Sequence, residues 1–293
     1  MGLWFSIFFI VPILIIICYS FMEKGLYGGV VKKFTLDAYK QMLSPAYGIV
    51  FLRTLKMTVI ATAVSIAIAL PCGYAMARSK HQTVFLILVI VPFLTNSLIR
   101  IFAWMTILGD DGILNNVLKF FSGIISSITG SDKPFKTHQF MYTQFSVILV
   151  SIYMYLPYAI LPIFTAVDRF DFSLLEAARD LGATKPQAML KVLIPGIKSG
   201  IISALIFTFI PIFGNYTVPQ LVGSTESYML GNTIMDQIQK FRNYPLASAF
   251  SVVLTVISMA AILFMISSDK KEQKLKKVSN KEDTNIPSLA QTL

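Results

Sequence analysis

Long apolar stretches alternate with shorter polar segments along this chain. Six of them are long enough to cross a membrane as helices, because about 20 apolar residues span the hydrocarbon core. Each must be helical, since lipid offers no hydrogen-bond partners to an exposed backbone. The pattern therefore predicts an all-α polytopic membrane protein with six transmembrane helices, at residues 3–22, 55–77, 83–108, 143–166, 198–221 and 246–267.

Composition agrees with this prediction. Hydrophobic residues make up 55% of the chain and charged residues 14%, whereas a soluble domain carries about 25% charged residues. The first stretch is interpreted as a retained span, because no basic region precedes it and no A-x-A cleavage site follows it. Cys18 and Cys72 both fall inside predicted spans without metal-ligand spacing, so we expect them to be packing residues.

The distribution of charge predicts which way the chain is oriented across the membrane. The net charge of +10 is interpreted as loop Lys and Arg facing anionic lipid, with no nucleic-acid partner. Residues 1–268 are predicted to form the membrane domain, and residues 269–293 a basic, disordered tail. Placing that tail in the cytoplasm satisfies the positive-inside rule by a narrow margin. An even number of spans then puts both termini in the cytoplasm.

The polar segment 168–197, between the fourth and fifth stretches, predicts a helical hairpin. Ser173 and Glu176 have the spacing of a capping box, in which the Ser hydroxyl accepts from the third helical amide and the Glu carboxylate accepts from the Ser amide. Gly182 adopts positive φ without steric cost, so we expect it to end the first helix. Thr184 begins a second box, and its helix is predicted to end near Pro195.

The middle of the first predicted helix has no catalytic chemistry. Ala177 and Ala178 are predicted to form a small-residue patch that a partner protein approaches, with Glu176, Arg179 and Asp180 around it. The alternative is a solvated loop between spans. Two consecutive capping boxes joined by a glycine favour the partner surface.

Polar and aromatic residues within the stretches mark a candidate substrate pathway. Polar residues in the fifth stretch either line a cavity, where unwound backbone is tolerated, or hydrogen-bond between helices. The Tyr and Trp rings either face a cation or belong to an interfacial aromatic belt. The candidates are Asn96, Trp104, Asp110, Tyr153, Tyr155, Tyr158, Asn215, Tyr216, Gln220 and Asp236.

Arg100 is the one full charge well inside a predicted span. An intramembrane charge is costly and predicts a functional role by default. It either lies near the outer end of a broken third span and extends to water, or pairs with a carboxylate or with carbonyls. We expect a gating or structural role.

The hairpin resembles the EAA loop of ABC importer permeases. Glu176, Ala177, Ala178, Gly182 and Pro195 match that motif, with Val192 and Ile194 at its Ile and Leu positions. The resemblance implies a type I importer permease in which this loop forms cytoplasmic coupling helices that sit in a cleft of an ATPase subunit. The candidate coupling residues are Ser173, Glu176, Ala177, Ala178, Arg179, Asp180, Gly182, Thr184 and Pro195.

Residues 91–101, residues 34–39 and the span layout are similar to the spermidine/putrescine permease subfamily. This resemblance implies half of a translocation pathway in a bacterial plasma membrane. It also implies a second homologous permease, giving a heterodimer, together with two ATPase subunits and an extracytoplasmic substrate-binding protein. The chain has no G-x-x-x-x-G-K-[ST] motif. We therefore expect it to be non-catalytic and without a cofactor, with ATP and Mg in the partner ATPase.

Three other functions remain as alternatives. The first is an ABC importer permease for another small organic solute. The second is a gradient-driven secondary transporter, a class that usually shows buried ionisable relays and inverted repeats. The third is an integral membrane enzyme, which is disfavoured because His81 and His138 lie in different loops.

Overall fold

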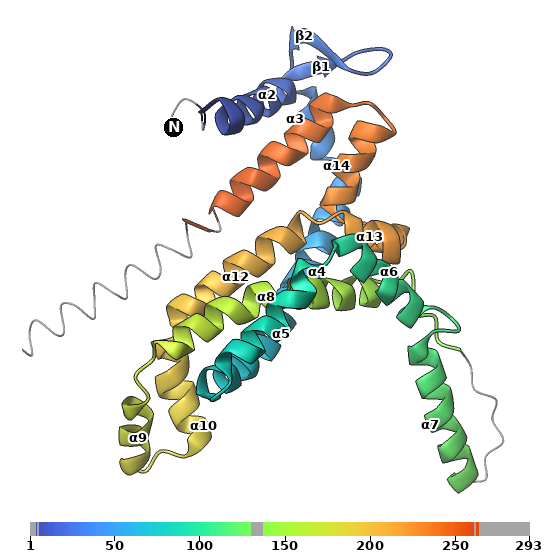
Figure 1. Cartoon of the computed structure of the whole chain (residues 1–293). Helices are drawn as coiled ribbons and strands as arrows, with labels where there is room; N and C mark the ends of the chain where they lie inside the picture. The colour runs from blue at the N-terminus through green and yellow to red at the C-terminus, as the bar shows by residue number, and fades with distance from the viewer. Residues whose placement is uncertain (1–3, 5, 130–136, 261, 264–293) are drawn as a thin grey trace, which may run out of the picture.

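The computed structural model describes residues 4, 6–129, 137–260 and 262–263. The described part is built mainly of helices (Figure 1). The predicted basic tail at residues 269–293 and the end of the sixth apolar stretch lie outside the described residues.

Three helices form the centre of the molecule: α4 (Pro45–Arg78), α8 (Gln144–Asp168) and α12 (Lys198–Phe213). They contact one another and contribute much of the buried apolar core (Figure 1). Both α4 and α8 are long and apolar enough to cross a membrane. The prediction of a membrane-length helix at the second and fourth apolar stretches is therefore confirmed.

Two glycines let the central helices approach closely. A Cβ at Gly73 of α4 would lie 2.8 Å from Ile163 Cγ2 of α8. A Cβ at Gly200 of α12 would lie 3.0 Å from the Pro162 carbonyl oxygen of α8. Neither site has room for a larger side chain, so α8 is held closely on two sides.

The third apolar stretch is bent. It consists of α5 (Gln82–Leu94) and α6 (Ser97–Leu108), and α5 meets the longer helical segment Ser97–Ser122, which begins with α6, at 91°. Asn96 begins the second part, because its side-chain oxygen accepts a hydrogen bond from the Leu98 amide at 2.8 Å. The apolar stretch predicted over 83–108 is thus a bent pair of helices, in agreement with the interpretation that placed Arg100 beside a broken third span.

The fifth apolar stretch is also interrupted. Just before this stretch, the helical segment Lys185–Gly196 meets α12 at an angle of 71°. Helix α12 ends at Phe213, and α13 (Thr217–Val222) follows after a break within the stretch.

Two shorter apolar helices occupy Ser6–Ser20 and Tyr244–Ala260. Within the described chain, two helices reach membrane-spanning length, or four when each bent pair is taken as one span.

A small structure at one end was not predicted. Strands β1 (Met22–Lys24) and β2 (Val30–Phe34) form an antiparallel hairpin after α2 (Val11–Ser20), and α3 (Asp37–Met42) follows. Its tip is fixed to the segment after α14 (Leu230–Gln239), because the Gly29 amide donates to the Arg242 carbonyl at 3.0 Å.

Helix α7 (Ile113–Thr129) was not predicted either. It extends away from the central helices (Figure 1) and exposes apolar side chains, including Phe120 and Phe121. Its base is fixed by Asn115, whose amide nitrogen donates to the His138 carbonyl at 3.0 Å.

Candidate functional site

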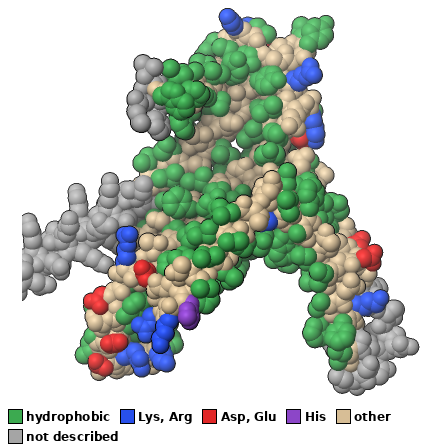
Figure 2. Space-filling model, viewed as in Figure 1, with side chains coloured by type: hydrophobic (Ala, Val, Ile, Leu, Met, Phe, Trp, Pro, Cys, Tyr) green, Lys and Arg blue, Asp and Glu red, His purple; other side chains and the backbone are tan. Residues whose placement is uncertain are grey.

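The predicted polar hairpin is present at one end of the molecule. It contains α9 (Ser173–Asp180), α10 (Lys185–Ala188), a π-helical turn η2 (Met189–Leu193) and α11 (Ile194–Gly196). Figure 2 shows acidic and basic side chains gathered over this end, in contrast to the apolar surface of the central helices. The hairpin is therefore a polar projection from an apolar body.

The start of the first arm differs from the prediction. Helix α9 begins at Ser173, with Phe172 at the N-cap position and no side-chain cap from Ser173. Instead, the Ser173 amide donates to Asp171 Oδ1 at 3.0 Å. The predicted Ser173–Glu176 capping box is wrong, because Asp171 supplies the acceptor. Hydrogen bonds from the Ser173 side chain and backbone lower the pKa of Asp171 below its usual value.

The end of the first arm agrees with the prediction. Gly182 has a φ of 89°. Its amide donates to the Arg179 carbonyl at 2.9 Å, and the Ala183 amide donates to the Ala178 carbonyl at 3.1 Å. This pair of bonds is a Schellman motif, which ends a helix by using its last free carbonyls. The predicted glycine stop is confirmed.

The second arm begins where the sequence predicted it to begin. The Thr184 amide donates to Gln187 Oε1 at 3.0 Å, which is the return half of a capping box. Pro195 lies within α11, and the arm ends at Gly196. The predicted end near Pro195 is confirmed.

The two arms bury one face and expose the other. Leu175 is buried, and Ala178 packs against the same apolar core. Ala177 is exposed and Ala178 is half-buried, so the predicted small-residue patch is open mainly at Ala177. A recess of about 390 Å³ lies on the outer side of the hairpin, lined by Glu176, Arg179, Asp180, Gly182, Ala183 and Thr184.

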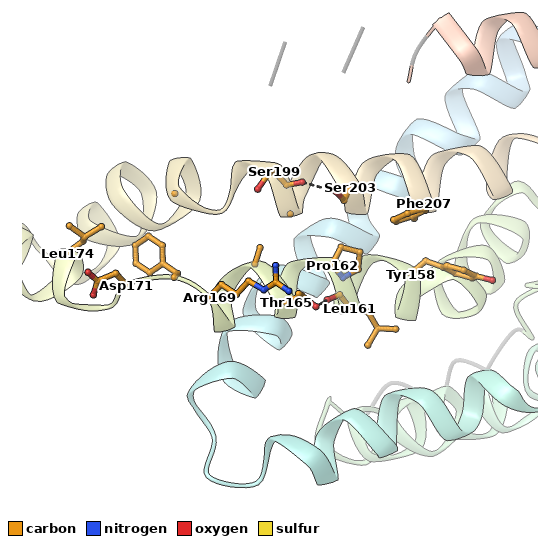
Figure 3. A pocket seen from close by; sticks show the side chains of 14 residues that line it. Tyr158, Leu161, Pro162, Thr165, Arg169, Asp171, Leu174, Ser199, Ser203 and Phe207 are labelled. Carbon is orange, nitrogen blue, oxygen red and sulfur yellow. Dashed lines mark hydrogen bonds between the residues drawn. The ribbon is translucent and has the colours of Figure 1, made fainter. Parts of the chain in front are cut away.

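A larger groove of about 890 Å³ lies between α8 and α12 (Figure 3). Its walls are mainly apolar, and Tyr158 and Phe207 lie towards one end. Two hydroxyl groups on it donate within their own helices: Thr165 to the Leu161 carbonyl at 2.9 Å and Ser203 to the Ser199 carbonyl at 2.9 Å. The groove therefore offers rings and hydroxyl oxygens to an occupant.

The other end of this groove reaches the hairpin. Arg169, Phe170, Asp171 and Leu174 line it there. The groove and the first arm consequently share the chain segment that joins α8 to α9.

The four aromatic pathway candidates of the third and fourth apolar stretches form two contacts. Tyr158 meets Tyr155 at 6.0 Å between ring centres. Trp104 and Tyr153 meet edge to face at 5.4 Å. Of these four residues, Tyr158 lines the groove. Trp104, Tyr153 and Tyr155 are not among the residues that line the groove, so Tyr158 is the one of these four that an occupant of the groove would contact.

The polar candidates of the fifth stretch hold local structure together. Asn215 Oδ1 accepts from the Thr217 amide at 2.9 Å and from the Val218 amide at 3.3 Å, which caps α13. Asn232, which the sequence did not single out, donates to the Tyr216 carbonyl at 2.9 Å and to Gln220 Oε1 at 3.4 Å. Of the two interpretations left open, these contacts match hydrogen bonding between segments.

The acidic candidates lie away from the groove. Asp110 is exposed in the turn between α6 and α7. Asp236 in α14 forms an ion pair with Lys240, the residue after the end of that helix, at 2.8 Å between Oδ1 and Nζ. This contact raises the pKa of Lys240, chiefly through the hydrogen bond from Lys240 to the carboxylate. Neither carboxylate lines the groove.

Arg100 lies just after the bend of the third stretch. Its guanidinium carbon is 5.9 Å from the centre of the Phe93 ring. Its Nε is buried without a hydrogen-bond partner. No carboxylate of the described residues forms an ion pair with it. Of the two arrangements predicted for Arg100, the position beside a broken third span agrees with the structure, and an ion pair with a carboxylate does not.

Sequence comparison places the chain among known membrane transport components. The family model described as "Binding-protein-dependent transport system inner membrane component" matches residues 65–270. The spermidine/putrescine transport system permease protein PotB of Escherichia coli (strain K12) is 35% identical, over 87% of this chain and 90% of that protein. PotB of Haemophilus influenzae is 34% identical, over 89% and 88%.

The fold agrees with this relationship. A crystal structure of a bacterial ABC transporter involved in the import of the acidic polysaccharide alginate matches with a TM-score of 0.65, covering 92% of each chain at 16% identity. At this identity the likeness shows the fold alone. With the family match and the PotB relatives, it establishes that the chain belongs to the family of binding-protein-dependent transport system inner membrane components, the permeases of ABC importers.

Proposed function

We propose that this permease imports polyamines such as spermidine and putrescine. The observation that carries the proposal is the 35% identity to PotB over nearly the full length of both chains. A permease with no substrate in its name, YdcU of Escherichia coli (strain K12), is 31% identical over 90% of this chain. Another small organic solute is therefore the alternative.

In this proposal the chain supplies half of the translocation pathway. It crosses the bacterial plasma membrane six times with both termini in the cytoplasm, and a second, homologous permease supplies the other half. The groove between α8 and α12 supports this role, because Tyr158 offers it an aromatic face and such a face attracts an ammonium group. Its walls carry few charges, so affinity for the substrate rests on the extracytoplasmic binding protein.

The hairpin at 168–197 is proposed to dock on the ATPase. Glu176, Ala177, Arg179 and Asp180 are exposed on its outer side, and its two arms are fixed by the Schellman motif and by Thr184. Two ATPase subunits would bind ATP and Mg and hydrolyse ATP. Their closure would move the hairpins and switch access to the pathway from outside to inside.

Uptake by the reconstituted importer tests the substrate. The chain is co-purified with the second permease, the ATPase and the binding protein, and labelled spermidine is followed into vesicles. Putrescine is expected to compete, whereas thiamine and amino acids are not. No spermidine uptake, with uptake of another solute, would replace the polyamine by that solute. Uptake that needs no ATPase and collapses with an ion gradient would contradict the importer mechanism itself.

A further inference from the structure

The joint between α8 and the hairpin consists of residues 169–172. This segment is not a regular helix. Movement of α9 reaches the central helices only when the joint does not bend. Side-chain contacts of the joint therefore decide whether the hairpin and the central helices move together.

The Phe172 ring bridges this joint and the end of α4. The Arg78 guanidinium carbon lies 4.8 Å from the centre of the Phe172 ring. The Tyr74 ring meets the same ring edge to face at 6.2 Å. Tyr74, Arg78 and Phe172 line one recess of about 410 Å³ with residues of both arms. One aromatic side chain thus connects the joint to a helix that is distant in sequence.

Phe170 extends this contact to the second arm. Its ring meets Phe172 edge to face at 5.6 Å. On its other side it covers Gly196, where a Cβ would overlap the ring. Gly196 is the last residue of the second arm. The two rings therefore join α4, the joint and the start of α12.

Helices α4 and α8 are themselves fixed to each other at this level. Gly73 lies against Ile163 with no room for a Cβ. The Gln82 side chain donates to the Ala77 carbonyl at 2.8 Å and to Asp168 Oδ1 at 3.2 Å, which ties the ends of α4 and α8. A side chain anchored on α4 is consequently anchored on the pair.

We infer that Phe172 is a positioning residue for coupling: its ring, held by Arg78 and Tyr74, makes the hairpin move as one body with α4 and α8. The inference rests on the proposed role of the hairpin as the ATPase contact. Without the ring, α9 swings on residues 169–172 when the ATPase closes. ATP hydrolysis then no longer depends on whether the binding protein has docked on the outer side of the importer.

The test uses the whole importer in vesicles and a Phe172→Ala variant. ATP hydrolysis is measured with and without the binding protein, purified together with the solute it carries. The variant is expected to retain its unstimulated hydrolysis and to lose stimulation by the binding protein about tenfold, within the range for residues in contact. Because the solute need not be a polyamine, this readout does not depend on the substrate assignment.

Matched variants separate positioning from general damage. Phe172→Trp retains a ring and is expected to restore the stimulation. Arg78→Gln removes the cation over the ring and should reduce stimulation, whereas Lys80→Ala removes an exposed cation just beyond α4 and should not.

Two results would overturn the inference. One is normal stimulation in Phe172→Ala. The other is a parallel loss of basal and stimulated hydrolysis that Phe172→Trp does not restore. The proposed role of the hairpin has its own control, because Glu176→Lys and Gly182→Pro should release the ATPase on co-purification. If they do not, the hairpin itself is not the contact; if they do while Phe172→Ala is normal, only the role of Phe172 fails.

Discussion

Asp171 Oδ1 accepts a hydrogen bond from the Ser173 amide at 3.0 Å, and Asp171 also lines the groove between α8 and α12. One carboxylate thus caps the start of α9, the first helix of the hairpin, and also lines the candidate pathway. The start of α9 is therefore sensitive to the charge of a groove residue.

Replacing Asp171 by Ala should loosen the first turn of α9, because the Ser173 amide loses its acceptor. Hydrogen–deuterium exchange of residues 173–176 in the assembled importer measures this. Exchange should be faster in Asp171→Ala at pH 7 and close to normal in Asp171→Asn, which retains an acceptor. Equal exchange in all three proteins would contradict the assignment of Asp171 as the cap.

The same contact predicts a pH dependence. The pKa of Asp171 is lowered in the folded chain, from an unfolded value of about 3.9. The contribution of the carboxylate is therefore fully present above the unfolded pKa and is lost as pH falls through the folded pKa. Protection of the amides at 173–176 from exchange, corrected for the intrinsic exchange rate at each pH, should fall in that acidic range in the native chain. Asp171→Asn should lack this component, and an identical loss of protection in both proteins would count against it.

Gly182→Ala should destabilise the hairpin, because Gly182 has a φ of 89° and an L-residue pays about 1–2 kcal/mol there. A Cβ would meet no atom within 4 Å, so the cost is conformational and not steric. Thermal unfolding of the purified complex measures it. Gly182→Asn should be milder, since Asn tolerates this conformation; Ala and Asn variants of equal stability would show that the backbone strain is absent.

Gly73→Ala should destabilise the central helices by about 1–3 kcal/mol through overpacking. Its Cβ would lie 2.8 Å from Ile163 Cγ2 and 3.1 Å from the Phe164 backbone nitrogen. Gly48→Ala in the same helix is the matched control, because a Cβ there meets nothing within 4 Å. Denaturation of the two variants should differ clearly in midpoint. A tolerated Gly73→Ala would mean that α4 and α8 lie further apart than described.

Tyr158→Leu should weaken uptake of a cationic substrate, whereas Tyr158→Phe should preserve it, because the ring and not the hydroxyl attracts the cation. A cation–π contact of about 0.5–2 kcal/mol predicts a change in apparent affinity of roughly 2- to 30-fold. Tyr153→Leu is the control, since Tyr153 contacts Trp104 and does not line the groove. Uptake constants for labelled spermidine decide between them, and equal effects at both tyrosines would remove Tyr158 from the pathway.

Sequence periodicity predicted the central helices well, since α4 and α8 are continuous apolar helices. It gave a broken third span only as one of two alternatives and did not place the bend at Asn96, because apolar residues continue on both sides of it. It missed α7 because half of that helix is polar, although the recurrence of Val117, Phe120, Phe121 and Ile124 is typical of an amphipathic helix. The adjacent Gly28 and Gly29 were the local signal for the β-hairpin.

Within the hairpin, local spacing predicted Gly182 and Thr184 correctly and Ser173 incorrectly. The error arose because Asp171, two residues before Ser173, offers its amide a competing acceptor. Sequence spacing alone does not predict contacts between distant segments. For this reason the Phe172–Arg78 contact and the hydrogen bonds of Asn232 emerged only from the fold.

The strand hairpin anchored to Arg242 also provides a reporter of sidedness. Leu26 and Tyr27 at its tip are 101% and 97% exposed, and the bond from Gly29 to Arg242 keeps them clear of the helices. In the proposed topology this tip faces the cell exterior, so a protease specific for aromatic residues, added to spheroplasts, would cut beside Tyr27. The same protease added to the outside of inverted vesicles would leave it intact, because the tip would then lie in the vesicle lumen, and a single gel would establish which way the permease faces.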